Sequence, residues 1–207
     1  MIVESENDKY FIEALITHIS ANIEIGQPVC TIDEYDCLGG ISKLEERLRA
    51  LTHRIIKGEI DKVGIIFDAD EIGIKERTKQ IQEKIDLILD ELPNESFEVK
   101  SFIYIQNSGG NGELETVLKA IKSKDATVAN CLKSWQECLP EDKKLNQKEF
   151  DKFWIQIYQR YDCCTKKESK RAGEKCDNQA SLKKDIYNLD NPILNDLKKF
   201  LQELGEE

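Results

Sequence analysis

The stretch KVGIIFDADE, residues 62–71, decides the expected fold. Its first six residues form a largely apolar run that ends in Asp68, which is typical of a strand buried on both faces of a parallel sheet. Two further acids, Asp70 and Glu71, follow at once. The stretch therefore predicts a central strand over Lys62–Phe67 with carboxylates at its carboxyl end.

Strand and helix patterns alternate over residues 1–122. Further strands are expected at Met1–Val3, Pro28–Ile32 and Phe97–Ile105. Between and after them, apolar residues recur every three or four positions, which predicts helices with one buried face. These residues are Phe11, Ile12, Leu15, Ile16 and Ile19; Ile41, Leu44, Leu48, Leu51 and Ile55; Ile74, Ile81, Ile85 and Ile88; Leu114, Val117, Leu118 and Ile121. Strands joined by helices in this way predict an α/β domain with a parallel sheet over residues 1–122.

The alternation ends after Ser123, and helical spacing continues alone. Three helices are predicted, with faces formed by Val128, Leu132 and Trp135; by Phe150, Phe153, Trp154, Ile157, Tyr158 and Tyr161; and by Leu194, Leu197, Leu201 and Leu204. The polar, basic segment Thr165–Asn178 is expected to be a loop or a frayed helix. Residues 123–207 are therefore predicted to be a helical extension packed on the α/β domain.

Composition restricts the class of protein. The 207 residues carry a formal net charge of −10. An acidic surface repels a polyanion, which disfavours binding of nucleic acid over the whole surface but not a local or metal-mediated contact with phosphate. No apolar run approaches the roughly 18 residues that span a bilayer, and a secretory signal pattern is absent. We therefore expect a cytoplasmic protein that does not associate with membranes.

The seven cysteines predict reduced thiols. Their odd number does not fit an extracellular disulfide framework, and no CxxC pair occurs among them. The two histidines lie far in sequence from most of the cysteines. Structural thiols are therefore favoured over a zinc site.

Acidic residues gather where the predicted strands end. They are Glu4 and Asp8 after the first strand, Asp68, Asp70 and Glu71 after the third, and Glu113 and Glu115 after the fourth. Because the carboxyl ends of parallel strands meet at one edge of a sheet, we expect several of these side chains to lie close together.

Helix capping accounts for some of these acids. Ser5 and Asp8 match a capping box, and Asp70 stands where it could cap the following helix. Glu113 and Glu115 precede or begin a helix, where the helix dipole favours negative charge. Taken singly, each of these motifs favours capping over catalysis.

Capping does not account well for Glu4 and Asp68, which lie on the strand side of their loops. Like charges gathered at one edge repel one another unless a cation compensates them. Carboxylate oxygens are the ligands that Mg²⁺ prefers. Taken together, the acids favour a divalent-metal site.

Two stretches resemble the signature motifs of Toprim domains. VESEND, residues 3–8, is similar to a strand-end glutamate in a VEGxxD context, and IIFDADE, residues 65–71, is similar to the DxD that follows a hydrophobic strand. GELETVL, residues 112–118, resembles a weaker third element of small stand-alone members. Ser5 stands where the family usually has glycine. The resemblance covers about residues 1–122 and implies a Toprim-like, Rossmannoid three-layer fold with a central parallel sheet, extended by the C-terminal helices.

The resemblance also implies a role for each of these acidic residues. Glu4 would be a general acid/base or a metal ligand, and Asp68 and Asp70 would hold Mg²⁺ or Mn²⁺. In the related overcoming-lysogenisation-defect nucleases, acids at the positions of Asp8 and Glu115 complete the metal site. Such a protein cleaves phosphodiester bonds in nucleic acid with the help of the metal.

The chain lacks features of the other Toprim enzymes. A topoisomerase needs a DNA-gate architecture that 207 residues cannot house, and a primase needs a zinc module. A small nuclease remains, and because no GxxxxGK[ST] loop is present, any ATP-driven step would come from a separate ATPase. Such a pair fits a role in phage defence or nucleic-acid processing.

One dense basic run is the internal candidate for contact with nucleic acid. It comprises Lys166, Lys167, Lys170 and Arg171, followed by Lys175. A solvated basic loop explains the same residues and is slightly favoured.

Two other functions compete with the nuclease. GIIFDADEI, residues 64–72, also resembles the DxD motif of haloacid-dehalogenase-like phosphatases, with Asp68 as the nucleophile and Asp70 as the acid/base. That reading gives Glu4 no role. A catalytically inert Toprim-like binding module is the third hypothesis, and the presence of Glu4, Asp68 and Asp70 disfavours it.

Overall fold

The computed structural model of the chain describes residues 1–30, 40–90, 98–104 and 112–206. Three parallel strands form a small sheet in the order β1-β2-β3, with bounds Ile2–Val3, Lys62–Asp68 and Glu98–Tyr104. Ile2 pairs with Ile65, and Val63 pairs with Val99. The strands predicted at Met1–Val3, Lys62–Phe67 and Phe97–Ile105 are confirmed, the last within Glu98–Tyr104.

The strand predicted at Pro28–Ile32 is wrong for Pro28–Cys30, and its last two residues lie outside the described ranges. The segment still runs beside β1, because the amides of Gly26 and Val29 donate hydrogen bonds to the carbonyls of Met1 and Val3 at 2.9 and 3.0 Å. These donors are three positions apart and their acceptors only two. Pro28, between the donors, has no amide hydrogen. A regular ladder therefore does not form.

Helices make up most of the rest of the described chain. Their bounds are α1 Glu6–Ile19, α2 Gly40–Ile56, α3 Gly73–Leu89, α4 Leu114–Ala120, α5 Thr127–Glu137, α6 Gln147–Ile157, α7 Ala172–Lys175, α8 Asn178–Leu182 and α9 Asn195–Gly205. Short 3₁₀ turns lie at Glu141–Lys143, Glu168–Arg171 and Pro192–Leu194, and a π turn at Tyr158–Cys163 extends α6. The helices predicted from apolar spacing are all present in the described residues.

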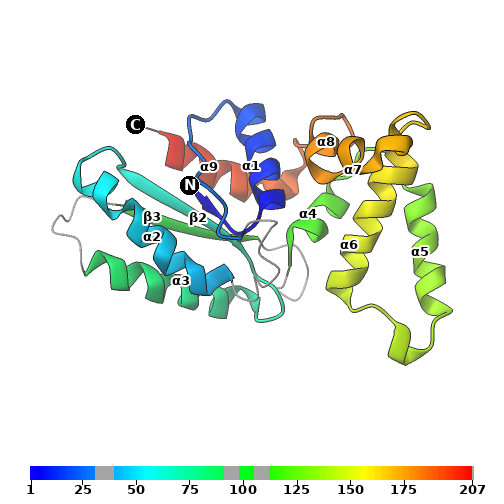
Figure 1. Ribbon diagram of the computed structural model, residues 1–207, viewed down its shortest axis with the longest axis horizontal. Helices are drawn as coiled ribbons and strands as arrows, with labels where there is room; N and C mark the ends of the chain where they lie inside the picture. Colours follow the sequence, from blue (N-terminus) through cyan, green and yellow to red (C-terminus); the bar gives the residue numbers. More distant parts are fainter. Residues whose placement is uncertain (31–39, 91–97, 105–111, 207) are drawn as a thin grey trace.

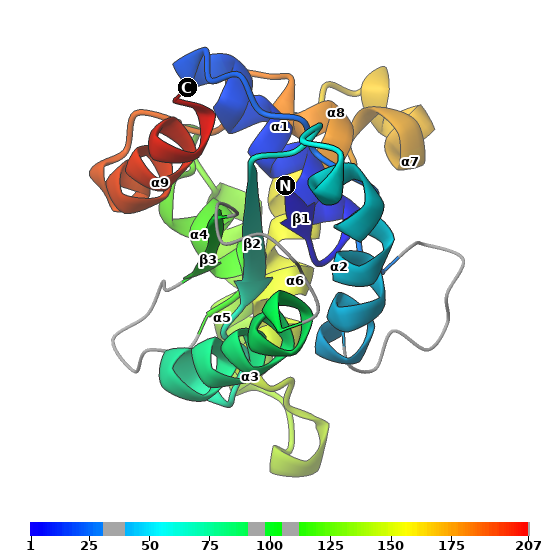
Figure 2. The same ribbon diagram turned by 90° about the vertical axis from the view of Figure 1, so that its left-hand side faces the viewer.

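Helices pack against both faces of the sheet (Figures 1 and 2). Because side chains alternate along a strand, Ile65 and Phe67 of β2 join the apolar cluster under α2 and α3, whereas Ile66 joins the cluster under α1, α4 and α9. Gly64 allows α9 to pack closely against β2, because a Cβ atom at this position would lie 2.3 Å from the side chain of Leu204 in α9. The C-terminal helix therefore covers one face of the sheet directly.

The remaining helices lie beyond one end of the sheet. Figure 1 shows α5 and α6 side by side at this end, with α4 between them and the strands and with α7 and α8 nearby. Trp154, Tyr158 and Tyr187 belong to the same apolar cluster as α1 and α9. None of the helices in the described residues combines the length and apolar character needed to cross a bilayer.

Candidate metal centre and pocket

Glu4 and Asp68 meet at the carboxyl end of the sheet. Glu4 follows β1 directly, and Asp68 is the last residue of the parallel neighbour β2. The Asp68 amide donates a hydrogen bond of 3.2 Å to Oε2 of Glu4. The parallel pairing of the two strands thus brings residues 64 positions apart into contact.

Asp8 joins them from the first turn of α1. Its Oδ2 accepts hydrogen bonds from the Ser5 amide at 2.9 Å and from the Ser5 hydroxyl at 2.5 Å, and its own amide donates to Ser5 Oγ at 3.3 Å. The capping box predicted from the sequence is therefore present. It uses only one oxygen of Asp8, because Oδ1 is buried and has no hydrogen-bond partner.

The three carboxyl groups resist ionisation. Burial, followed by repulsion from Glu4 and Glu115, raises the pKa of Asp8 to about 7 despite the hydrogen bonds from Ser5. Burial, followed by the charges of Asp8, Glu4 and Glu115, raises the pKa of Asp68 well above its usual range. Burial also raises the pKa of Glu4. These acids are near enough to one another to disfavour simultaneous negative charge.

Glu115, 9% exposed, lies in the first turn of α4. Its charge adds to the repulsion that raises the pKa values of Asp8 and Asp68. Glu4, Asp8, Asp68 and Glu115 are named the acid cluster below. Asp68 is partly exposed as a residue, yet its Oδ1 is buried without a hydrogen-bond partner, like Oδ1 of Asp8. An unpaired buried acceptor costs about 1–3 kcal/mol, so the fold keeps two oxygens available here at the expense of stability.

Asp70 makes different contacts from the acid cluster. Its Oδ1 accepts a hydrogen bond of 2.6 Å from Nζ of Lys148, and its Oδ2 pairs with Arg77. Its backbone is left-handed, with φ of 48°. It does not cap α3, because the N-cap residue is Ile72, whose side chain makes no capping hydrogen bond. The cap considered for Asp70 on sequence grounds is therefore wrong.

Two lysines that sequence reasoning missed face these acids from α6. Lys148 reaches Asp70 and lies 3.4 Å from Oε2 of Glu113, and Lys152 lies 3.6 Å from the same oxygen. Burial opposes the charge of Lys148, but its contacts with Asp70 and Glu113 raise its pKa overall. The two lysines are four positions apart and so share one helix face. That spacing alone does not distinguish them from solvated lysines.

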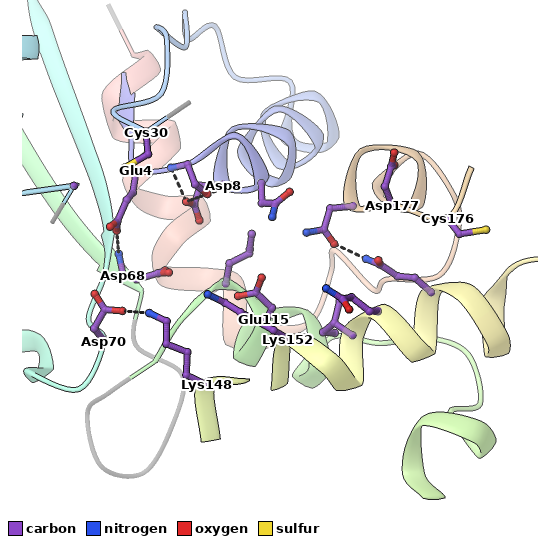
Figure 3. Close-up of a pocket in the computed structure, with 18 of the residues that line it drawn as sticks. Glu4, Asp8, Cys30, Asp68, Asp70, Glu115, Lys148, Lys152, Cys176 and Asp177 are labelled. Carbon is purple, nitrogen blue, oxygen red and sulfur yellow. Dashed lines mark hydrogen bonds and ion pairs between the residues drawn. The ribbon is translucent and has the colours of Figure 1, made fainter. Parts of the chain in front are cut away.

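The acids and lysines line one pocket of about 1090 Å³. Figure 3 shows Glu4, Asp8, Asp68 and Asp70 at one end, Lys148 and Lys152 on α6 along one wall, and Cys176 and Asp177 at the opposite end. A volume of this size accommodates a ligand larger than a single metal ion. The pocket therefore combines carboxylates suited to a cation with cations suited to a phosphate.

The predicted basic run lies outside this pocket lining. Lys166, Lys167, Lys170 and Arg171 are exposed, and Arg171 pairs with Glu174. The next two residues, Ala172 and Gly173, do line the pocket. The basic run therefore lies near the rim of the pocket. This position is compatible with a solvated loop and also with contact to a substrate that extends out of the pocket.

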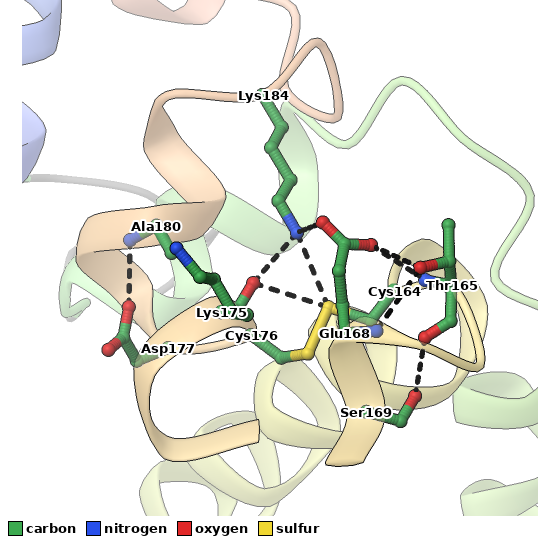
Figure 4. The surroundings of a disulfide bond; sticks show 9 residues. All are labelled: Cys164, Thr165, Glu168, Ser169, Lys175, Cys176, Asp177, Ala180 and Lys184. Atoms are coloured by element: carbon green, nitrogen blue, oxygen red, sulfur yellow. Dashed lines mark hydrogen bonds and ion pairs between the residues drawn. A yellow bond between two sulfur atoms is a disulfide. The ribbon is translucent and has the colours of Figure 1, made fainter. Parts of the chain in front are cut away.

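A disulfide between Cys164 and Cys176 holds this rim (Figure 4). The prediction of reduced thiols is wrong for these two residues, because the chain folds back after the π turn and brings their Cα atoms to 6.1 Å. The prediction is also wrong for Cys30, which is disulfide-bonded. Cys131, Cys138 and Cys163 are free thiols.

A divalent cation fits the acid cluster by donor type and charge. Within the residues that the structure describes, no three histidine, cysteine or acidic side chains stand as a ready-made ligand set. Oδ1 of Asp8 and Oδ1 of Asp68 are nevertheless buried oxygens without a hydrogen-bond partner. Hard oxygen donors of this kind suit Mg²⁺, and a cation would relieve the repulsion among the carboxylates.

Comparison with known proteins gives a family but no activity. A family model described as "Protein of unknown function (DUF3226)" matches residues 1–206, and the chain belongs to this family. No curated protein and no solved structure matches the chain.

Proposed function

We propose that this member of the DUF3226 family is a metal-dependent phosphodiesterase of the nuclease type, acting with Mg²⁺ or Mn²⁺. The observation that carries the proposal is the acid cluster, with two unpaired buried oxygens, facing Lys148 and Lys152 across one pocket. A carboxylate cluster without a cation is destabilising. Its combination with lysines on the facing wall suits an anionic substrate bound beside a cation.

The residues take separate roles in this proposal. Asp8 and Asp68, each with an unpaired buried oxygen, would hold the metal, and Glu115 would complete the set only after its side chain moves toward them. Asp70 is a further candidate ligand if it leaves Lys148. Bound Mg²⁺ would supply charge neutralisation at the phosphodiester and a lowered pKa of the attacking water. Glu4, whose pKa is raised by burial, is suited to accept a proton from that water.

Lys148 and Lys152 would bind the phosphate. Both side chains are partly exposed to the pocket, at 39% and 45%. Lys148 keeps its charge because Asp70 and Glu113 stabilise it. An ammonium group beside the scissile phosphate offsets charge that grows during cleavage.

The finer fold belongs to the same proposal. Helices on both faces of a parallel sheet, with acids at the carboxyl ends of its strands, support a Toprim-like, three-layer Rossmannoid arrangement. Nucleic acid is the proposed substrate, with a separate ATPase as a partner and the cytoplasm as the compartment. Lys166, Lys167, Lys170 and Arg171 at the rim would contact a substrate that extends beyond the pocket.

Cleavage assays test this function. Labelled single-stranded DNA, duplex DNA and RNA are incubated with the protein in Mg²⁺, Mn²⁺ or EDTA, alongside Asp68→Asn. Asp61→Asn, an exposed acid just before the same strand, is the matched control. We expect metal-dependent cleavage that falls roughly 100-fold in Asp68→Asn and stays unchanged in Asp61→Asn.

Two synthetic esters separate the competing functions. Hydrolysis of p-nitrophenyl phosphate without any cleavage of bis-p-nitrophenyl phosphate or nucleic acid would favour the phosphatase, with Asp68 as the nucleophile. Turnover of none of these substrates in either metal would contradict the proposal and favour the binding module.

A further inference from the structure

The pocket changes character along α6. Along the wall formed by α6, the pocket-lining residues run from Lys148 to Gln159. These residues are eleven positions apart, which is about 16 Å at the helical rise of about 1.5 Å per residue. At the far end the lining residues include the amides Gln156, Gln159 and Asn178. The acid cluster therefore occupies one end of the pocket only, and the other end presents these three amides together with Arg160 and Asp177, whose charges are opposite.

The far end is built around a buried glutamine. Gln159, 3% exposed, lies in the π turn that extends α6. Its Nε2 donates hydrogen bonds to Oδ1 of Asn178 at 2.5 Å and to the Tyr187 hydroxyl at 2.9 Å. Tyr187 is itself 5% exposed. The packing around the amide pair of Gln159 and Asn178 therefore fixes both side chains.

These hydrogen bonds determine which atoms remain available. Nε2 of Gln159 uses both of its hydrogens, which leaves Oε1 as its acceptor. Asn178 accepts through Oδ1, which leaves Nδ2 as its donor. Within the described residues, neither remaining atom makes a further hydrogen bond, and both residues line the pocket. The amide pair thus has one acceptor and one donor left, on two side chains that a hydrogen bond joins.

An adjacent donor and acceptor complement the edge of a nucleobase. Asparagine and glutamine read bases through such paired contacts, and enzymes that act on an extruded base bind its Watson–Crick edge in a pocket. The charged residues that line this end, Asp177 and Arg160, are opposite in sign, so together they give a phosphate little net attraction there. Lys148 and Lys152 attract a phosphate at the other end. A nucleotide would therefore lie with its base at the amide pair and its phosphate toward these lysines.

We infer that the amide pair is a nucleobase subsite and that the protein acts on an unpaired nucleotide, with its phosphate toward Lys148 and Lys152. The inference rests on the proposed phosphodiesterase function and narrows its substrate. In a duplex the base edge is already paired, and an amide pair recessed in a pocket cannot reach it. Single strands, ends and extruded nucleotides are therefore the substrates that fit.

Binding of abasic oligonucleotides tests the subsite without relying on cleavage. Fluorescein-labelled single-stranded pentanucleotides, either intact or with one tetrahydrofuran abasic residue at each position in turn, are titrated in EDTA and followed by anisotropy. The phosphate count stays constant, so only the base contact changes. We expect one position at which the abasic residue weakens binding about tenfold.

Asn178→Asp is the discriminating variant. It keeps an oxygen to accept the hydrogen bond from Gln159 but replaces the presented donor with an acceptor, so the tenfold difference should disappear or move to another base. Asp61→Asn, an exposed acid outside the pocket lining, is the matched control and should retain the difference. Its thermal denaturation midpoint and that of Asn178→Asp are measured in parallel.

Different results would contradict the nucleobase subsite and the phosphodiesterase function. Equal affinity for intact and abasic oligonucleotides at every position, no binding of either, or full discrimination by folded Asn178→Asp would overturn the subsite even if the protein cleaves DNA. Discrimination without cleavage in any metal would support the subsite and contradict the proposed phosphodiesterase. If Asn178→Asp does not fold, the comparison on the wild-type protein decides alone.

Discussion

Neutralising Asp8 is expected to stabilise the protein when divalent metal is absent. The side chain is 3% exposed, and burial, together with the nearby Glu4 and Glu115 carboxylates, raises its pKa from 3.8 to about 7. Asp8→Asn removes the buried charge. The amide oxygen can still accept the capping hydrogen bond from Ser5.

The expected size follows from proton linkage. Because the pKa of Asp8 is higher in the folded state, the folded protein binds an additional proton between about pH 4 and pH 7. The stability associated with Asp8 is complete below pH 3.8, its ordinary pKa, and is lost as the pH rises through about 7. Ionisation of Asp8 thus lowers the free energy of unfolding by about 4 kcal/mol at pH 8 and about 2 kcal/mol at pH 5.

Urea unfolding followed by circular dichroism measures this effect. Wild type, Asp8→Asn and the exposed control Asp61→Asn are compared at pH 8 and pH 5 in EDTA. We expect Asp8→Asn to exceed wild type by up to about 4 kcal/mol at pH 8, with a smaller gain at pH 5 and no change in the control. A variant no more stable than wild type at pH 8, or a gain independent of pH, would show that the Asp8 charge does not destabilise the folded protein.

Three further variants, one of them a double substitution, test the pocket and its rim. Lys148→Met should lower the cleavage rate about 100-fold but change the free energy of unfolding in urea by less than about 1 kcal/mol, since its ion pairs are partly exposed. Gly40→Ala places a Cβ atom 2.8 Å from Oε1 of Glu4 and, by moving that carboxylate, should slow cleavage about tenfold with little change in the denaturation midpoint. Replacing Cys164 and Cys176 by alanine should lower the free energy of unfolding by about 3 kcal/mol, because the disulfide restricts the unfolded chain.

Each of these substitutions has a matched control. Lys143→Met alters an exposed lysine, 71% exposed, in the turn before α6. Gly173→Ala alters a pocket residue whose added Cβ atom meets nothing within 4 Å. Cys131→Ala alters an exposed free thiol. A control that changes its readout as much as the test variant would contradict the corresponding explanation.

Local patterns predicted most of the fold. The apolar run before Asp68 indicated β2, and spacings of three and four residues indicated the helices, because burial of one face imposes these periods. The segment at Pro28 was mistaken for a strand, since β-branched residues favour strands whereas the missing proline amide prevents a regular ladder. Periodicity also did not show that α9 would cover Gly64 of β2.

The candidate site was predictable only in part. The contact between Glu4 and Asp68 follows from the parallel pairing of β1 with β2. It was predictable because both acids stand at the carboxyl ends of predicted strands. The ion pair between Asp70 and Lys148 joins residues 78 positions apart, and a lysine on a helix face gives no local sign of such a partner. The Cys164–Cys176 disulfide was likewise missed, because it depends on the turn that follows α6.

Calorimetric titration with Mg²⁺ and Mn²⁺ tests whether the acid cluster binds a divalent cation. Wild type, Asp68→Asn and Asp61→Asn are titrated at pH 8, where ionised carboxylates are available to bind metal. A metal site in the acid cluster predicts saturable binding by wild type and Asp61→Asn that is lost in a folded Asp68→Asn. Absence of binding by wild type at millimolar metal, or equal binding by all three proteins, would contradict it.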